Sequence, residues 1–160
     1  MSDLEPGLLE TDAVEVRNLR SSDLDWVVRI DRQYSQRTRS EYFRKKLVEA
    51  DEDTGVRISL AALIDGEPAG FLTGRLYYGE FGRPEPVALI DSIGVDGARA
   101  GQHVGGALMR QLTMNLRALG VDRVQTQVDW DQGDLIAFFR REGFLLAPRL
   151  CLELSLGRAP

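Results

Sequence analysis

The sequence predicts an α/β fold, an α+β mixed sheet with elements in the order β-α-α-β-β-β-α-β-α-β. Two observations predict this class. The chain of 160 residues is 43% apolar and 28% charged, the balance of an ordinary globular domain, and segments of strand and helix periodicity alternate along it. We expect residues 1–12 to be a flexible acidic tail, because they carry four carboxylates and no basic side chain. Residues 13–160 are expected to form a single domain.

The first half of the chain carries signals for one strand, two helices and a hairpin. In chain order, we expect a strand, two helices and two strands at residues 14–19, 21–34, 40–50, 56–64 and 69–78. Ser21 is the candidate N-cap of the first helix, because its hydroxyl could accept a hydrogen bond from the first turn. Asp65 and Gly66 form a dipeptide typical of a two-residue hairpin turn.

The second half repeats the alternation of strand and helix. We expect strand, helix, strand, helix and strand at residues 87–95, 104–119, 122–130, 133–142 and 150–156. Gly120 and Gly143 follow the two helices and are typical of helix ends. The last strand is predicted from leucines at every second position, which would turn one face inward: Leu150, Leu152, Leu154 and Leu156.

Charge and composition exclude several classes of function. A net charge of -5 and a pI near 5.0 argue against a nucleic-acid partner, since phosphate binding needs a basic surface. The sequence has no apolar run long enough to cross a bilayer and no secretory leader pattern, so we expect a cytoplasmic protein with no membrane partner. Single copies of cysteine and histidine, Cys151 and His103, predict no disulfide and no metal site. Cys151 is expected to be structural.

The segment 90–109 carries the strongest functional signal. A strand ends there, a short loop follows, and glycines flank the first turn of an amphipathic helix. The first N–H groups of a helix lack internal partners and lie at the positive end of its dipole, so this turn suits a phosphate or pyrophosphate. A plain connecting turn is the alternative. It is not a Walker loop, because no Gly-Lys-Ser/Thr follows.

Two motifs in this order resemble the GNAT-type N-acetyltransferases. Residues 100–105 lie on the family's pyrophosphate pattern Gln/Arg-x-x-Gly-x-Gly/Ala, with departures at Ala100 and His103. Residues 132–144 resemble the family's Asn-x-x-Ala-x-x-Phe-Tyr-x-x-x-Gly-Phe, and Phe139 stands in place of the tyrosine. The resemblance implies an acyl-CoA N-acyltransferase-like fold.

The resemblance also implies a site for acetyl-CoA as co-substrate. The backbone of residues 93–95 would bind the pantetheine arm and polarise the thioester carbonyl. The full set expected to bind acetyl-CoA is Ile93, Gly94, Val95, Gly101, Gln102, His103, Val104, Gly105, Gly106, Gln132 and Phe139. Asp91 stands where many members of the family carry a glutamate that acts as the catalytic base. The alternative for Asp91 is a carboxylate that faces solvent or caps a neighbouring N–H.

The chemistry of acetyl transfer explains why these residue types matter. A lysine-like amine has a pKa of about 10.4 and must lose a proton before it attacks, so a general base helps. Phe139 cannot protonate the departing thiolate; Tyr34, Tyr77 or Tyr78 could substitute. His103 could bind phosphate through its imidazole or point to solvent. If its backbone is left-handed, it costs about 1 kcal/mol relative to glycine.

We therefore expect an acetyl-CoA-dependent N-acetyltransferase that acts on a primary amine of a small molecule or peptide by direct transfer. The alternatives are a non-catalytic module that binds CoA and an interaction domain without a ligand. The basic stretch 29–46 either favours an acidic acceptor or is a solvated helix face, whereas the overall acidity favours a cationic amine. A homodimer is left open. The acceptor side would be walled by Trp26, Tyr34, Arg37, Arg39, Tyr42, Tyr78, Glu80 and Phe81.

Overall fold

The structure is a computed structural model that describes residues 13–52 and 58–158. The chain divides into two compact units, Met1–Gln127 and Val128–Pro160. The expected acidic tail lies outside the described residues. A single domain over residues 13–160 remains a prediction.

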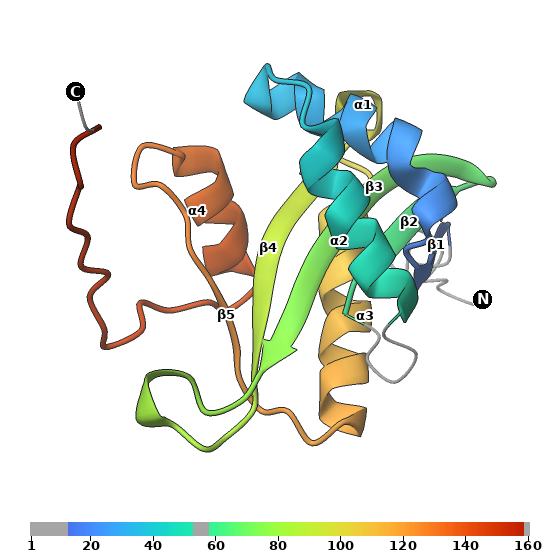
Figure 1. Cartoon of the computed structure of the whole chain (residues 1–160). Helices are drawn as coiled ribbons and strands as arrows, with labels where there is room; N and C mark the ends of the chain where they lie inside the picture. The colour runs from blue at the N-terminus through green and yellow to red at the C-terminus, as the bar shows by residue number, and fades with distance from the viewer. Residues whose placement is uncertain (1–12, 53–57, 159–160) are drawn as a thin grey trace. The chain divides into compact units, whose positions relative to one another are not determined.

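The first unit is built on a five-stranded sheet with the spatial order β1-β2-β3-β4-β5. The first four strands pair antiparallel and β5 pairs parallel to β4, which confirms the expected mixed sheet. Helices α1 and α2 lie on one face of the sheet and α3 on the other (Figure 1). The elements are β1 (Val14–Asn18), α1 (Leu24–Ser35), α2 (Ser40–Glu52), β2 (Leu60–Ile64), β3 (Glu67–Tyr77), β4 (Val87–Val95), α3 (Val104–Ala118) and β5 (Val124–Thr126), with short 3-10 turns η1 (Ser21–Asp23), η2 (Glu80–Gly82) and η3 (Gly97–Arg99).

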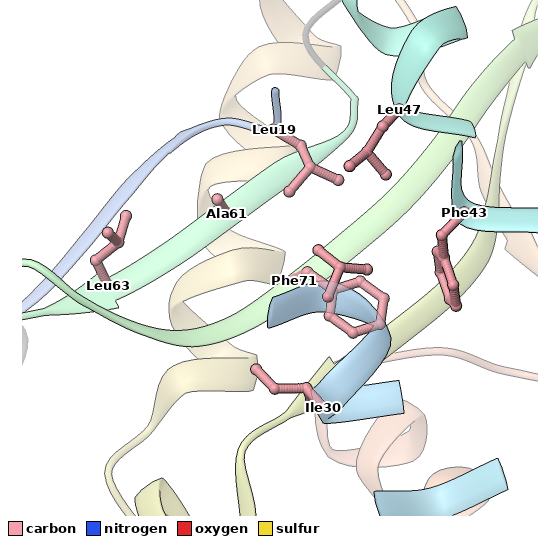
Figure 2. Close-up of a cluster of buried hydrophobic side chains, with 8 residues drawn as sticks. Leu19, Ile30, Phe43, Leu47, Ala61, Leu63 and Phe71 are labelled. Carbon is pink, nitrogen blue, oxygen red and sulfur yellow. The ribbon is translucent and has the colours of Figure 1, made fainter. Parts of the chain in front are cut away.

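The core of this unit lies between the sheet and the helices α1 and α2. Phe71 of β3 is the central ring, and the ring of Phe43 from α2 meets it edge to face at 5.4 Å between centroids. Figure 2 shows the aliphatic side chains gathered around them from β2, α1 and α2, together with Leu19, which directly follows β1. On the opposite face, a Cβ at Gly70 would lie 2.8 Å from Val104 of α3, so only glycine lets the helix approach so closely.

Local turn chemistry explains the β2–β3 hairpin. Asp65 and Gly66 both have positive φ, 52° and 79°, which fits the two-residue turn expected there. Gly120 follows α3 with φ 72° and confirms the predicted helix end.

The start of the first helix differs from the sequence prediction. Ser21 is the first residue of the 3-10 turn η1, and the N-cap positions of η1 and α1 belong to Arg20 and Asp23. Instead, a carboxylate oxygen of Asp23 accepts a hydrogen bond from the N–H of Arg20 at 2.8 Å. A carboxylate is a stronger acceptor than a hydroxyl, and Asp23 also accepts two hydrogen bonds from the Arg17 guanidinium and one from the Trp26 indole.

Two strands are shorter than expected. Strand β2 begins at Leu60, and residues 56 and 57 of the predicted strand lie outside the described residues. Strand β5 covers three residues of the predicted 122–130, since it pairs with β4 only at Ala88–Ile90. β-propensity makes a segment fit a sheet, but the number of ladder partners sets its length.

The second unit contains α4 (Gly133–Arg141). Phe139 is buried, and its ring lies 5.2 Å from that of Phe138 and 4.9 Å from that of Phe144, between centroids. Gly143 has φ 93° and ends the helix as predicted.

The predicted C-terminal strand is wrong. Residues 150–158 form no strand, and Cys151 is exposed rather than set in a sheet. The four leucines of the alternating pattern are 82 to 88% exposed. Alternation predicts a half-buried strand only where a neighbouring strand supplies the hydrogen bonds, and the sequence carries no sign of that neighbour.

Candidate active site

The candidate site is organised by a bulge in β4 at Asp91. Ser92 pairs with Thr73 and Ile90 pairs with Gly74, so Asp91 is an extra residue with no partner on β3. A bulge of this kind turns one side chain out of the regular alternation and increases the local twist. The hydroxyls of Thr73 and Ser92 are 2.5 Å apart and fix the pairing directly beyond the bulge.

Two cations hold the Asp91 carboxylate. The Lys46 ammonium lies 3.1 Å from Oδ2, and Nε of Arg75 lies 3.7 Å from Oδ1. The side chains of Lys46 and Asp91 are only 18% and 12% exposed, so water screens this pair weakly. Lys46 also lies 3.8 Å from Glu49. Burial, with the Asp91 charge adding to it, raises the pKa of the nearby Tyr42 hydroxyl.

An open pocket of about 170 Å³ adjoins this ionic cluster. Lys46 and Arg75 belong to its lining, and Glu49 brings a carboxylate. The pocket therefore presents both signs of charge next to the bulge.

Beyond the bulge, β4 leaves one edge open. The N–H of Asp96 donates to the carbonyl of Ala69 on β3 at 2.8 Å. Because backbone groups alternate along a strand, Gly94 also points its N–H and C=O toward β3, while Ile93 and Val95 point theirs away. The pairing of β5 with β4 ends at Ile90, so within the described part of this unit no strand covers these outward groups.

The outward carbonyl of Val95 accepts a hydrogen bond from the Tyr34 hydroxyl. Tyr34 comes from α1. Burial, with the charge of Asp96 adding to it, raises the pKa of Tyr34, so the hydroxyl keeps its proton at neutral pH. Of the three tyrosines that the sequence left as candidates, Tyr34 is the one that contacts the predicted pantetheine edge.

Gly94 has a packing role in the structure. A Cβ at this position would lie 2.6 Å from the ring of Phe71 and 3.2 Å from Ile30. The glycine thus lets α1 and the core reach β4. The backbone N–H and C=O of Gly94 face β3. Gly94 therefore offers no backbone group at the open edge and only separates Ile93 from Val95.

The strand-to-helix turn contains two residues with left-handed backbone conformation. Asp96 begins it, and its carboxylate accepts from the N–H of Ala98 at 3.1 Å. This hydrogen bond, opposed by burial and helped by Gln33 and Arg29, lowers the pKa of Asp96. Gly101 and His103 both have positive φ, 79° and 60°. His103 therefore stands at a left-handed position that favours glycine.

The start of α3 brings the remaining predicted residues of this turn together. Gly101, Gln102 and His103 are exposed, while Val104 and Gly105 are buried and Gly106 is half-buried. The carbonyl of His103 accepts the N–H of Ala107 at 3.0 Å, the first regular helical bond of α3. The N–H groups of the first turn precede that bond and face the loop end of the helix.

Gln132 and Phe139 lie in the second unit. Gln132 precedes α4 and is exposed, and its N–H donates to the carbonyl of Asp129 at 2.9 Å. Phe139 is buried in its aromatic cluster, the structural role that its apolar ring suits. Their part in binding acetyl-CoA remains a prediction.

The expected acceptor wall divides into two groups. Trp26 of α1 donates to Asp23, and Arg39, in the connection between α1 and α2, binds Asp31 of α1 at 3.0 and 2.5 Å, so both side chains stabilise α1 and the segments next to it. The other six are exposed: Tyr34, Arg37, Tyr42, Tyr78, Glu80 and Phe81.

Sequence reasoning missed the partners of the site. Lys46 contacts Asp91 from 45 residues away along the chain, and Arg75 contacts it from 16 residues away. Gln33 contacts the turn from more than 60 residues away. A basic stretch containing Lys46 was visible, but nothing in its spacing names a carboxylate on a distant strand.

Two searches of the described residues concern other kinds of site. No helix among residues 13–52 and 58–158 is long and apolar enough to span a membrane. No group of three or more histidine, cysteine, aspartate or glutamate side chains in that part of the chain could hold a metal ion.

A mixed sheet with an open strand edge that leads into a glycine-bearing helix start defines an acyl-CoA N-acyltransferase-like class. The model of the acetyltransferase (GNAT) family matches residues 15–144, and the chain belongs to this family. Membership confirms the resemblance drawn from the two motifs and places the chain among the N-acetyltransferases.

Solved structures share the fold at low sequence identity. An aminoglycoside acetyltransferase from an uncultured soil metagenomic sample is 18% identical over 91% of this chain and 98% of its own, with a TM-score of 0.70. A ribosomal-protein-alanine N-acetyltransferase from Brucella melitensis biovar Abortus 2308 is 17% identical over 91% and 100%, at 0.71. A transcriptional regulator from Bacillus halodurans C-125 is 18% identical over 89% and 99%, at 0.73. A search of curated proteins found no match.

Proposed function

We propose that this chain transfers an acetyl group from acetyl-CoA directly to a primary amine. The observation that carries the proposal is the open edge of β4 at Ile93 and Val95, which runs into the left-handed turn before α3. An extended ligand can add to such an edge as a strand would, with its hydrogen bonds to backbone groups. The phosphates would then meet N–H groups of the turn and of the first residues of α3, but not that of Gln102, which donates to the carbonyl of Arg99 at 3.2 Å.

The outward backbone groups of β4 suit the pantetheine arm and the thioester of acetyl-CoA. The N–H and C=O of Ile93 would hold the pantetheine arm, and an N–H near the bulge would donate to the developing oxyanion. In the reaction the amine nitrogen bonds to the acetyl carbon, the carbon–sulfur bond breaks, and the amine gives up one proton. With phenylalanine at 139, the thiol can leave as its anion, because its pKa is about 8.5.

Asp91 is our proposed base for that proton. It lies at the bulge directly before the open edge, where a carboxylate can reach the amine directly or through one water. Ion pairs with Lys46 and Arg75 hold the carboxylate in position. Asp91 could instead be only the anchor of this ionic cluster, and the pH dependence of the rate separates the two roles.

A steady-state assay tests the activity. Release of free thiol from acetyl-CoA is measured with a broad panel of primary amines, including polyamines, amino acids and peptides with a free N-terminus. We expect release that depends on at least one amine. Binding of acetyl-CoA without any amine-dependent release would support the non-catalytic module, and no binding would support the interaction domain. A cytoplasmic location and a homodimer stay predictions from the sequence.

A further inference from the structure

Side chains of α1 hold three consecutive residues at the end of β4. Tyr34 donates to the carbonyl of Val95, Gln33 contacts both Asp96 and Gly97, and Arg29 lies 3.4 Å from the Asp96 carboxylate. These three residues are the last residue of β4, Val95, and the first two residues of the turn, Asp96 and Gly97. Helix α1 therefore holds the backbone at residues 95–97, where β4 ends and the turn begins.

Gln33 makes the two-sided contact in this group. Its amide nitrogen donates to Oδ1 of Asp96 at 3.2 Å, and its amide oxygen accepts the N–H of Gly97 at 2.9 Å. Both polar ends of one side chain are used on adjacent residues, so the side chain fixes the rotation of the peptide between them. An apolar side chain of equal length could do neither.

Asp96 links Gln33 to the next residues of the turn. The same Oδ1 that accepts from Gln33 accepts the N–H of Ala98 at 3.1 Å, and the Asp96 N–H is bound to the carbonyl of Ala69 on β3. Asp96 is 8% exposed, whereas Gly97 and Ala98 are exposed. The first residues of the turn are thus tied to the sheet and to α1, while their surface faces solvent.

We propose that Gln33 is a positioning residue for the pyrophosphate turn, residues 97–106. The inference rests on the proposed function, because that function makes this turn a phosphate site. Gln33 touches no reacting atom in this role. It holds Gly97 and Asp96, and through them the direction in which the turn presents its N–H groups. It also joins α1, which carries part of the expected acceptor wall, to the donor side of the site.

Calorimetry and hydrogen exchange test this inference. In Gln33→Met we expect the Kd for CoA to rise about tenfold, which corresponds to about 1.4 kcal/mol. The Kd for pantetheine, which has no diphosphate, should stay within twofold of that of the parental protein. Without ligand, the Gly97 amide should exchange faster, because its acceptor is gone. Gln111→Met is the matched control, since Gln111 bonds to Asn115 within α3 and should change none of these values.

The outcomes separate the inference from the proposed function. If the parental protein binds CoA and Gln33→Met keeps its Kd and its Gly97 exchange rate, the positioning role is overturned and the acetyltransferase stands. An equal loss of affinity for CoA and pantetheine also overturns it, because the effect is then not on the phosphate turn. If the parental protein binds no CoA, both fall. Gln33→Glu provides a second variant: it keeps an acceptor for Gly97 but places a second carboxylate beside Asp96, and it should weaken CoA binding as well.

Discussion

Lys46 on α2 and Asp91 at the β4 bulge form an ion pair of 3.1 Å whose two side chains are largely withdrawn from water. The pair connects α2 to β4 at the bulge, where the regular alternation of side chains along the strand is interrupted. A general base in this position would work beside a fixed positive charge.

Asp91→Asn is expected to lower kcat by at least tenfold and to remove the acidic limb of the pH–rate profile, because the amide cannot accept the proton. The measurement is kcat/KM against pH with the best amine of the panel. A variant that keeps the parental limb would assign the base to another group and leave Asp91 as an anchor.

Lys46→Met is expected to lower the free energy of unfolding by about 2 kcal/mol, because it leaves a poorly solvated carboxylate with only the more distant Arg75. Urea denaturation measures the change. The double variant Lys46→Met/Asp91→Asn should recover part of the loss, since the uncompensated charge is then gone. Additive losses in the double variant would show that the two side chains do not interact.

His103→Gly is expected to be more stable than His103→Ala by about 1 kcal/mol, because φ is 60° there and glycine adopts this conformation without the Cβ penalty. Both variants remove the imidazole, so the comparison isolates the effect of the Cβ. Equal unfolding midpoints for the glycine and alanine variants would speak against backbone strain at this turn.

Acid should weaken the fold through Asp23. Burial raises its pKa, but hydrogen bonds from Arg17, the Arg20 N–H and Trp26 outweigh that effect and hold the pKa below the ordinary 3.8. A carboxyl with a depressed folded pKa stabilises the fold above its unfolded pKa and loses that contribution as the pH falls through the folded value. The loss should therefore come below about pH 4.

Asp23→Asn checks this prediction by urea denaturation at several pH values. The variant should be less stable than the parent at neutral pH and should lose less on acidification. Asp25→Asn, at an exposed position in the first turn of α1, is the control and should follow the parental curve. An Asp23→Asn curve parallel to the parent would mean that other carboxylates cause the acid sensitivity.

Much of the fold could be predicted from the sequence, because local signals agreed with the tertiary structure. The dipeptide at 65–66, the glycine at 120 and the periodicity of 104–119 each indicate a conformation that a few neighbouring residues determine. The last strand failed for the opposite reason. Its alternating leucines would give a strand one apolar face. A strand also needs a partner strand, and pairing is not a local property of the sequence.

The candidate site was predictable in its backbone and unpredictable in its ion pairs. One contiguous segment indicated the end of the strand, the glycines of the turn and the energetic cost of histidine at position 103 if its backbone is left-handed. That Asp91 meets Lys46 and Arg75, and that Gln33 reaches Gly97, depends on how α1 and α2 pack on the sheet. No spacing along the chain encodes such contacts.

Titration of the folded chain with coenzyme A in a calorimeter tests the central claim most directly. We predict saturable heat with one site per chain, and the backbone amide signals of Ile93, Val95 and residues 101–106 should shift in a parallel NMR titration. No detectable heat at millimolar coenzyme A, with the protein shown to be folded, would contradict the account.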